Sequence, residues 1–113
     1  MTHRYILDRA GLPQMCEDVL VWAQWFETAN RTLELTQIGD VKVSTVFLGL
    51  DHNFGGHRAR PVLWESMIFG GPLDGEQWRY ETEMQAHQGH AKFVEMVKAA
   101  GVKTRAITLD EES

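Results

Sequence analysis

The ten residues from Val41 to Leu50 constrain the fold of this chain more than any other stretch. The run is rich in β-branched side chains, alternates polar with apolar residues at its start, and becomes apolar on both sides from Thr45 onward. This pattern is typical of a central strand that is covered on both faces near one end. A central strand needs partner strands and a covering layer, and the rest of the chain has to supply both.

The neighbouring segments have the pattern of partner strands. A turn at Gly39-Asp40 predicts a hairpin, and a second turn around Asp74-Gly75 predicts another. The predicted strands of the sheet cover residues 32–36, 41–50, 62–69 and 77–81. The short run Tyr5–Leu7 predicts a brief strand or an ordered arm. We therefore expect an antiparallel sheet of about four strands.

Two segments have the spacing of amphipathic helices, with apolar positions that step by four, three, four and three. The first is predicted over residues 13–30. Its apolar positions are Met15, Val19, Trp22, Phe26 and Ala29. The second begins with a capping box of Thr82 and Gln85 and is expected to end at Gly101. Its apolar face is Ala86, His90, Phe93, Val97 and Ala100. Residues 102–109 are predicted to be an edge strand or an ordered tail.

These elements predict a single α+β domain over residues 1–113, with two amphipathic helices packed on one face of an antiparallel sheet. The length and the 43% apolar content suit one hydrophobic core. From about residue 109 the chain is acidic, and we expect this tail to be solvated.

Composition excludes several classes of function. The formal charge of -5 disfavours sequence-independent binding to nucleic acid, which needs a basic surface. The single cysteine, Cys16, excludes an internal disulfide and a zinc ribbon, and fits a reducing compartment. No signal peptide is recognisable, and no apolar run approaches the roughly 20 residues that span a bilayer. We therefore expect a cytoplasmic protein with no membrane partner.

Several motifs carry a resemblance over nearly the whole chain. They are Arg4-Tyr5-Ile6-Leu7-Asp8, Trp22-Ala23-x-Trp25-Phe26-Glu27, Val43-Ser44-Thr45-Val46-Phe47-Leu48-Gly49-Leu50-Asp51-His52, Met67-Ile68-Phe69-Gly70-Gly71, Arg79-Tyr80-x-Thr82 and Gly89-His90. The sequence resembles a family of small tailed-phage and prophage accessory proteins with no known activity. The resemblance implies an accessory protein that acts in the cytoplasm of the host cell. It implies no cofactor and no assigned site.

A few polar residues stand where such a fold can place chemical groups. Asp51 and His52 end the most buried strand, a frequent place for functional groups, although such a pair can also cap a loop. Glu65 shares the parity of apolar neighbours in its strand, so it either joins His52 in a polar site or is neutralised by Arg79. His90 lies at the centre of an apolar stripe, and a core histidine held by buried partners is the favoured interpretation.

Two further patterns indicate ligands only weakly. Glu83, His87 and His90 follow the spacing of a surface metal site, a spacing that often arises by chance. We expect neither a bound metal nor another cofactor. The loop 52–60 combines glycines, arginines and Phe54, and such a loop can hold a phosphate or a base. It lacks the P-loop form, and a plain solvent loop is the favoured interpretation.

The four tryptophans exceed what a small core needs. Trp22 and Trp25 cannot both point fully inward from one helix, so we expect one or two exposed tryptophans, as on partner-binding surfaces. The candidate binding residues are Asp51, His52, Phe54, Glu65, Arg79, Tyr80, His90, Trp25 and Trp78.

The sequence shows no nucleophile elbow, no Cys-His pair and no dense carboxylate cluster, so no catalytic residue is assigned. The leading hypothesis is a non-enzymatic protein that binds a host protein or a small signal molecule, with inhibition of a host defence system as its most specific form. The alternative is a small hydrolase or metal-dependent enzyme centred on Asp51, His52, Glu65 and His90. A homodimer is also expected, because a second copy readily covers surplus apolar surface.

Overall fold

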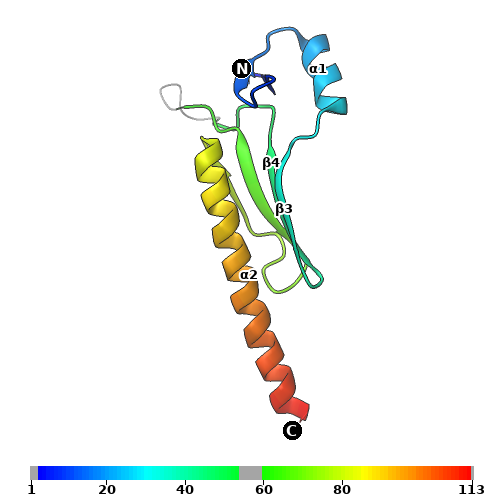
Figure 1. The fold of residues 1–113 in the computed structure, drawn as a ribbon, viewed down its shortest axis with the longest axis vertical. Coiled ribbons are helices and arrows are strands. Elements are labelled where there is room, and N and C mark those ends of the chain that lie inside the picture. The colour runs from blue at the N-terminus through cyan, green and yellow to red at the C-terminus, as the bar shows by residue number, and fades with distance from the viewer. Residues whose placement is uncertain (1–2, 54–59, 113) are drawn as a thin grey trace.

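A computed structural model describes residues 3–53 and 60–112, except for the side chains of 102–112. It has the predicted α+β fold, with a four-stranded antiparallel sheet, a small two-stranded sheet and two helices (Figure 1). The elements are β1 (Tyr5–Leu7), β2 (Pro13–Met15), α1 (Val19–Thr28), β3 (Thr32–Ile38), β4 (Val41–Phe47), β5 (Trp64–Phe69), β6 (Gln77–Tyr80) and α2 (Glu83–Glu112). Neither helix in this part of the chain combines the length and apolar character needed to cross a membrane.

The larger sheet has the order β3-β4-β5-β6, so the predicted central strand is confirmed. Val43, Thr45 and Phe47 of β4 are fully buried on the face that α2 covers. The opposite face is exposed at Lys42 and half-buried at Val46. Each strand pairs antiparallel with its neighbour in sequence. The predicted turns at Gly39-Asp40 and around Asp74-Gly75 join β3 to β4 and β5 to β6, whereas a long loop joins β4 to β5.

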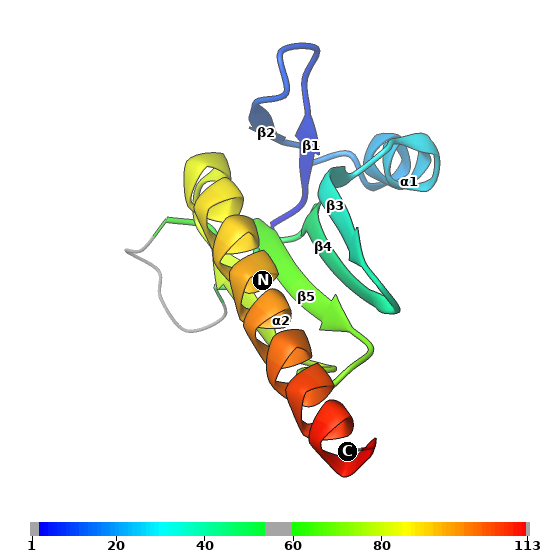
Figure 2. The same cartoon turned by 60° about the horizontal axis from the view of Figure 1, so that its bottom comes forward.

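Helix α2 lies across one face of this sheet (Figure 2). Its first turn is closed by the predicted capping box. The backbone N–H of Gln85 donates to Thr82 Oγ1 at 3.1 Å, and the backbone N–H of Thr82 donates to Gln85 Oε1 at 3.2 Å. The predicted stripe is buried against the sheet at Ala86, His90, Phe93 and Val97. The second amphipathic helix is therefore confirmed at its start and on its face.

The predicted end of this helix is wrong. Helix α2 passes through Gly101 and ends at Glu112, so the segment 102–109 is neither a strand nor a tail (Figure 2). A single helical glycine costs only about 1 kcal/mol, and the residues after it include no proline and several strong helix formers. The acidic end belongs to the same helix, which extends beyond the sheet and makes the molecule 62 Å long.

The predicted start of the first helix is also wrong. Residues Pro13–Met15 form strand β2, which pairs antiparallel with β1, the brief strand predicted there. Gly11 turns the chain between the two strands with a φ of 80°. Asp18 caps α1 instead, since its carboxylate accepts from the amide of Leu20 at 2.9 Å.

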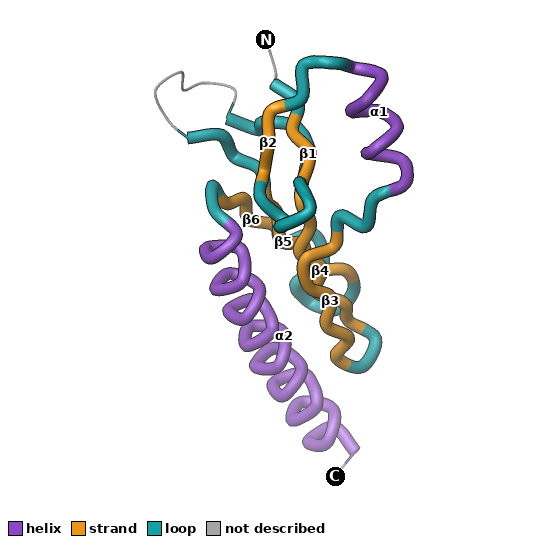
Figure 3. The backbone as a smooth tube through the Cα atoms, turned by 45° about the horizontal axis from the view of Figure 1, so that its top comes forward, coloured by secondary structure: helices purple, strands orange, loops and turns teal. Residues whose placement is uncertain are grey.

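Helix α1 contacts the end of the sheet through aromatic side chains. The Trp25 ring meets Phe47 edge-on at 5.8 Å, on the sheet face that α2 also covers. The Trp22 indole donates to Gly49 O at 3.0 Å. None of the residues of α1 is buried, and Val19, expected on the inner stripe, is 52% exposed. Figure 3 shows α1 and the β1–β2 pair at the same end of the molecule.

Candidate functional site

His90 is buried between α2 and the sheet and is only 2% exposed. Its Nε2 atom is hydrogen-bonded to Thr36 Oγ1 at 2.8 Å, and its Nδ1 atom to Thr45 Oγ1 at 2.7 Å. The Thr45 hydroxyl is also hydrogen-bonded to Ser66 Oγ. Both ring nitrogens are therefore satisfied, one by the buried Thr45 and one by the half-buried Thr36, which confirms the interpretation of His90 as a core histidine.

Burial lowers the pKa of His90, because a charged ring loses hydration between the helix and the sheet. The facing groups act in opposite directions: Glu34 of β3 raises this pKa and His87 of α2 lowers it. Desolvation is the largest of these effects, so His90 is neutral near pH 7.

The depressed pKa predicts a loss of stability in acid. The unfolded chain takes up a proton near pH 6.5, whereas folded His90 resists it, so the free energy of unfolding falls as pH drops below about 6.5. Replacement His90→Gln removes this titration. The stability advantage of the wild type over the variant should therefore shrink between about pH 7.5 and about pH 5.5, measured by chemical denaturation. An advantage that is constant over this range would contradict the lowered pKa.

The Glu83, His87 and His90 spacing does not build a metal site. His90 points into the sheet, whereas His87 lies outside and contacts Glu34 Oε2 through Nδ1 at 2.7 Å and Glu83 Oε2 through Nε2 at 3.6 Å. No group of three or more metal-binding side chains occurs in residues 3–53 and 60–101. His90 therefore belongs to a buried network, whereas His87 and Glu83 lie in an exposed set of polar contacts with Glu34.

Asp51 and His52 cap the loop that follows β4. Asp51 Oδ1 accepts from the amide of Asn53 at 2.8 Å and from that of Val62 at 2.9 Å, so it joins the two ends of the loop. His52 Nδ1 is hydrogen-bonded to Leu50 O at 2.8 Å. This geometry supports the loop-capping interpretation. Phe54 and the rest of the stretch 54–59 lie outside the described residues.

Glu65 lies on the sheet face opposite His90, so it does not join the buried core that its apolar neighbours in sequence indicated, and it forms no polar site with His90. In β5 the buried parity is that of Trp64, Ser66 and Ile68. Glu65 accepts instead from Arg79 Nε at 2.9 Å, the neutralising pair weighed above. Since Glu65 and His90 are on opposite faces, the groups of the enzyme hypothesis do not share one pocket.

The tryptophans separate into core and surface residues. Trp64 is buried and Trp25 is half-buried on Phe47, whereas Trp78 on β6 is 66% exposed. A groove of about 790 Å³ runs between β6 and α2, with Trp78 and Tyr80 among its lining residues. The Tyr80 ring packs directly over Gly89 of α2, and a Cβ atom at Gly89 would overlap its hydroxyl group. The position of the Tyr80 ring against α2 therefore requires a glycine at residue 89.

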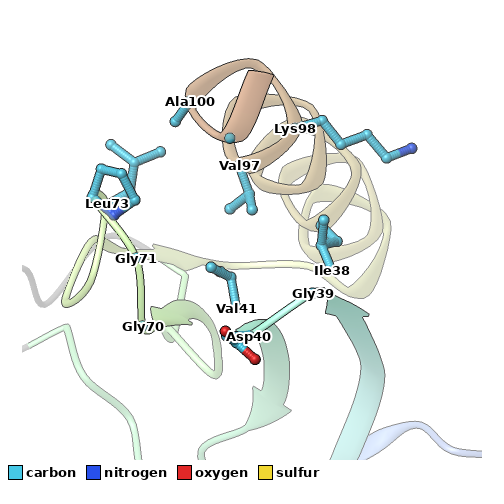
Figure 4. A pocket seen from close by; sticks show the side chains of 12 residues that line it. Ile38, Gly39, Asp40, Val41, Gly70, Gly71, Leu73, Val97, Lys98 and Ala100 are labelled. Atoms are coloured by element: carbon cyan, nitrogen blue, oxygen red, sulfur yellow. The ribbon is translucent and has the colours of Figure 1, made fainter. Parts of the chain in front are cut away.

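A second groove, of about 690 Å³, lies where α2 leaves the sheet (Figure 4). Val41 and Val97 point toward each other across it, whereas the Lys98 side chain extends away. Gly71, with a φ of 72°, forms part of its wall, and a Cβ there would lie 2.7 Å from Val41 Cγ2. The lining is largely aliphatic, so this groove suits an apolar group rather than a charged signal molecule.

Exposed apolar side chains gather in one stretch of the chain, which includes Met15 and Val19 of the helical stripe that was predicted to face inward. Of nine large apolar side chains exposed in the described residues, five lie between positions 12 and 21. They are Leu12, Met15, Val19, Leu20 and Val21, with exposed fractions between 49% and 73%. We call this set the 12–21 surface. The run Val19-Leu20-Val21 was the signal, because three consecutive residues of a helix cannot all face inward.

Comparisons with protein-family models, with curated proteins and with solved structures find no match to this chain.

Proposed function

We propose that this chain is a non-enzymatic binding protein that holds a host protein on its 12–21 surface. The observation that carries the proposal is the helix α1, which is attached to the body by Trp22, Trp25 and Phe26 and has no buried residue. This short helix contacts the rest of the protein on one side only, and Val19, Leu20 and Val21 are exposed. Such a helix can present apolar side chains to a partner.

The charges around this surface narrow the kind of partner. Residues 12–30 include three acidic side chains, Glu17, Asp18 and Glu27, and no lysine or arginine, while Arg4 and Arg31 contact this segment from outside it. All three are exposed. A partner with an apolar patch edged by basic residues is complementary to this arrangement.

Two arguments support an inhibitory role in a host cell. The resemblance to tailed-phage accessory proteins supports a host partner, with a defence protein as the most specific form of the proposal. The candidate polar groups are engaged in hydrogen bonds and ion pairs within the fold, which favours binding over catalysis. Occupying a functional surface of the partner is then the mechanism of inhibition.

A matched pair of substitutions tests the surface. Leu20 and Met84 are each the second residue of a helix and are 73% and 71% exposed, so Leu20→Lys and Met84→Lys perturb the fold equally. Only Leu20→Lys should weaken partner binding, by at least about tenfold, because a buried leucine contributes about 1.5–3 kcal/mol. Capture from host lysate, quantified by mass spectrometry, measures the difference.

The expected result is a protein that the wild type and Met84→Lys retain and Leu20→Lys loses. Equal capture by all three proteins would overturn the proposal, as would the absence of any protein enriched by the wild type over Leu20→Lys.

A further inference from the structure

The outer edge of β6 has no partner strand among the described residues. The Ile68 amide donates to Glu76 O at 2.9 Å, and in an antiparallel ladder alternate residues bond to the same neighbour. The even-numbered residues of β6 therefore direct their backbone groups toward β5. Gln77 and Arg79 direct their N–H and C=O groups outward, where an added strand can bond to them.

We propose that this edge pairs with the same edge of a second copy of the chain, antiparallel across a two-fold axis. A contact of this kind uses the same surface on both subunits and closes after one partner has bound. It joins two four-stranded sheets into one and removes an open sheet edge from each copy. The proposal uses none of the residues of the 12–21 surface and stands apart from the proposed function.

The sequence of β6 selects one register for this contact. The axis can pass through Gln77, Trp78 or Arg79. An axis through Arg79 places two arginines directly opposite each other, which is unfavourable. An axis through Gln77 pairs Arg79 with Gly75 of the partner subunit, a turn residue with a φ of 89° that is not extended. An axis through Trp78 avoids both problems and pairs Gln77 with the partner's Arg79.

In this register Trp78 lies directly opposite the partner's Trp78, and the two residues form a non-hydrogen-bonded pair of the antiparallel ladder. Such positions bring the two Cα atoms to about 4.5 Å and favour aromatic pairs. Within β6, Trp78 and Tyr80 point to the same face of the sheet, which is the face covered by α2. The Trp78 indole of each copy therefore lies on that face. The pairing therefore covers the exposed tryptophan of each copy and the groove beside it.

Helix α2 bounds the space beside Trp78. Its residues Phe93 and Val97 lie in one buried cluster with Val43 of β4 and Ile68 of β5, and its Gly89 lies against the Tyr80 ring of β6. The groove between this helix and β6 is open at Trp78, which is 66% exposed. The two indoles of the dimer therefore meet in the space between the two grooves.

Sedimentation measures the proposed association. At tens of micromolar the wild type is expected at twice the 12.9 kDa of one chain. Trp78→Lys should raise the dimer dissociation constant at least about tenfold, because it places two cations at the axis. Phe69→Lys is the matched control, since Phe69 is also exposed but lies on the other sheet face in β5. A monomeric wild type, or a dimer that Trp78→Lys leaves intact, would overturn the proposal.

Cysteine cross-linking tests the register. In a Cys16→Ser background with oxidised glutathione, Trp78→Cys should give a disulfide-linked dimer, since the Cα separation at the axis lies within the range of disulfides. Gln77→Cys should not, because residues diagonal to each other are about 7–8 Å apart. Preferential cross-linking of Gln77→Cys or Arg79→Cys would refute the Trp78-centred pairing.

Discussion

Replacement Gly89→Ala is expected to destabilise the protein by about 1–3 kcal/mol, the usual cost of overpacking a filled site. The added Cβ atom would overlap the Tyr80 ring and hydroxyl, which pack against the backbone of α2. Tyr80 is 8% exposed, so its ring cannot move aside without leaving the core cluster. The free energy of unfolding from urea denaturation measures the loss.

Gly101→Ala is the matched control in the same helix. No atom lies within 4 Å of a Cβ built at Gly101. Alanine is the better helix former by about 1 kcal/mol, so this variant should be as stable as the wild type or more stable. The same substitution is thus expected to have opposite signs at two positions of α2. A stabilising effect at both would show that Tyr80 does not require the glycine.

Replacement His90→Ala is expected to cost about 2–4 kcal/mol of stability at neutral pH. The variant loses a fully buried ring and the hydrogen bonds of that ring to Thr36 and Thr45, although Thr45 keeps its bond to Ser66. A core cavity and the loss of buried hydrogen bonds are each costly. Thermal and chemical denaturation measure the loss.

His87→Ala provides the comparison for this histidine. His87 lies one turn earlier in α2, but its side chain is 46% exposed and its contacts with Glu34 and Glu83 are on the surface. Exposed ion pairs contribute little, so this variant should lose less than about 1 kcal/mol. Similar losses at positions 87 and 90 would contradict the buried hydroxyl–imidazole network.

Much of the sheet could be predicted because its signals are local. The turns at Gly39 and Gly75 give the antiparallel pairs β3–β4 and β5–β6, and the β-branched run of β4 marks it as a central strand. The capping box of Thr82 located the start of α2 for the same reason. Of the β1–β2 pair, β1 was predicted as a brief strand or an ordered arm, but β2 was assigned to the first helix because its three residues are too few for a periodic pattern of their own.

The candidate site was less predictable, since it depends on which face of each element is covered. Glu65 was placed correctly on one face of its strand, but the buried face of that strand is the opposite one. His90 was placed correctly because a helical stripe identifies its own inner face, but spacing alone could not name Thr36 and Thr45 as its partners. Because Asp18 caps α1, Leu20 lies in the first turn of the helix, and its side chain is exposed there.

The attachment of the N-terminal arm has a kinetic consequence. The arm closes onto the far end of β4, where the Tyr5 amide donates to Gly49 O and the Asp51 amide donates to His3 O. Every pairing inside the larger sheet is between successive strands and closes quickly, whereas the arm closes a loop that contains α1 and the β3–β4 hairpin. Because no residue of α1 is buried, we expect the arm and α1 to detach by local opening more readily than the sheet and α2.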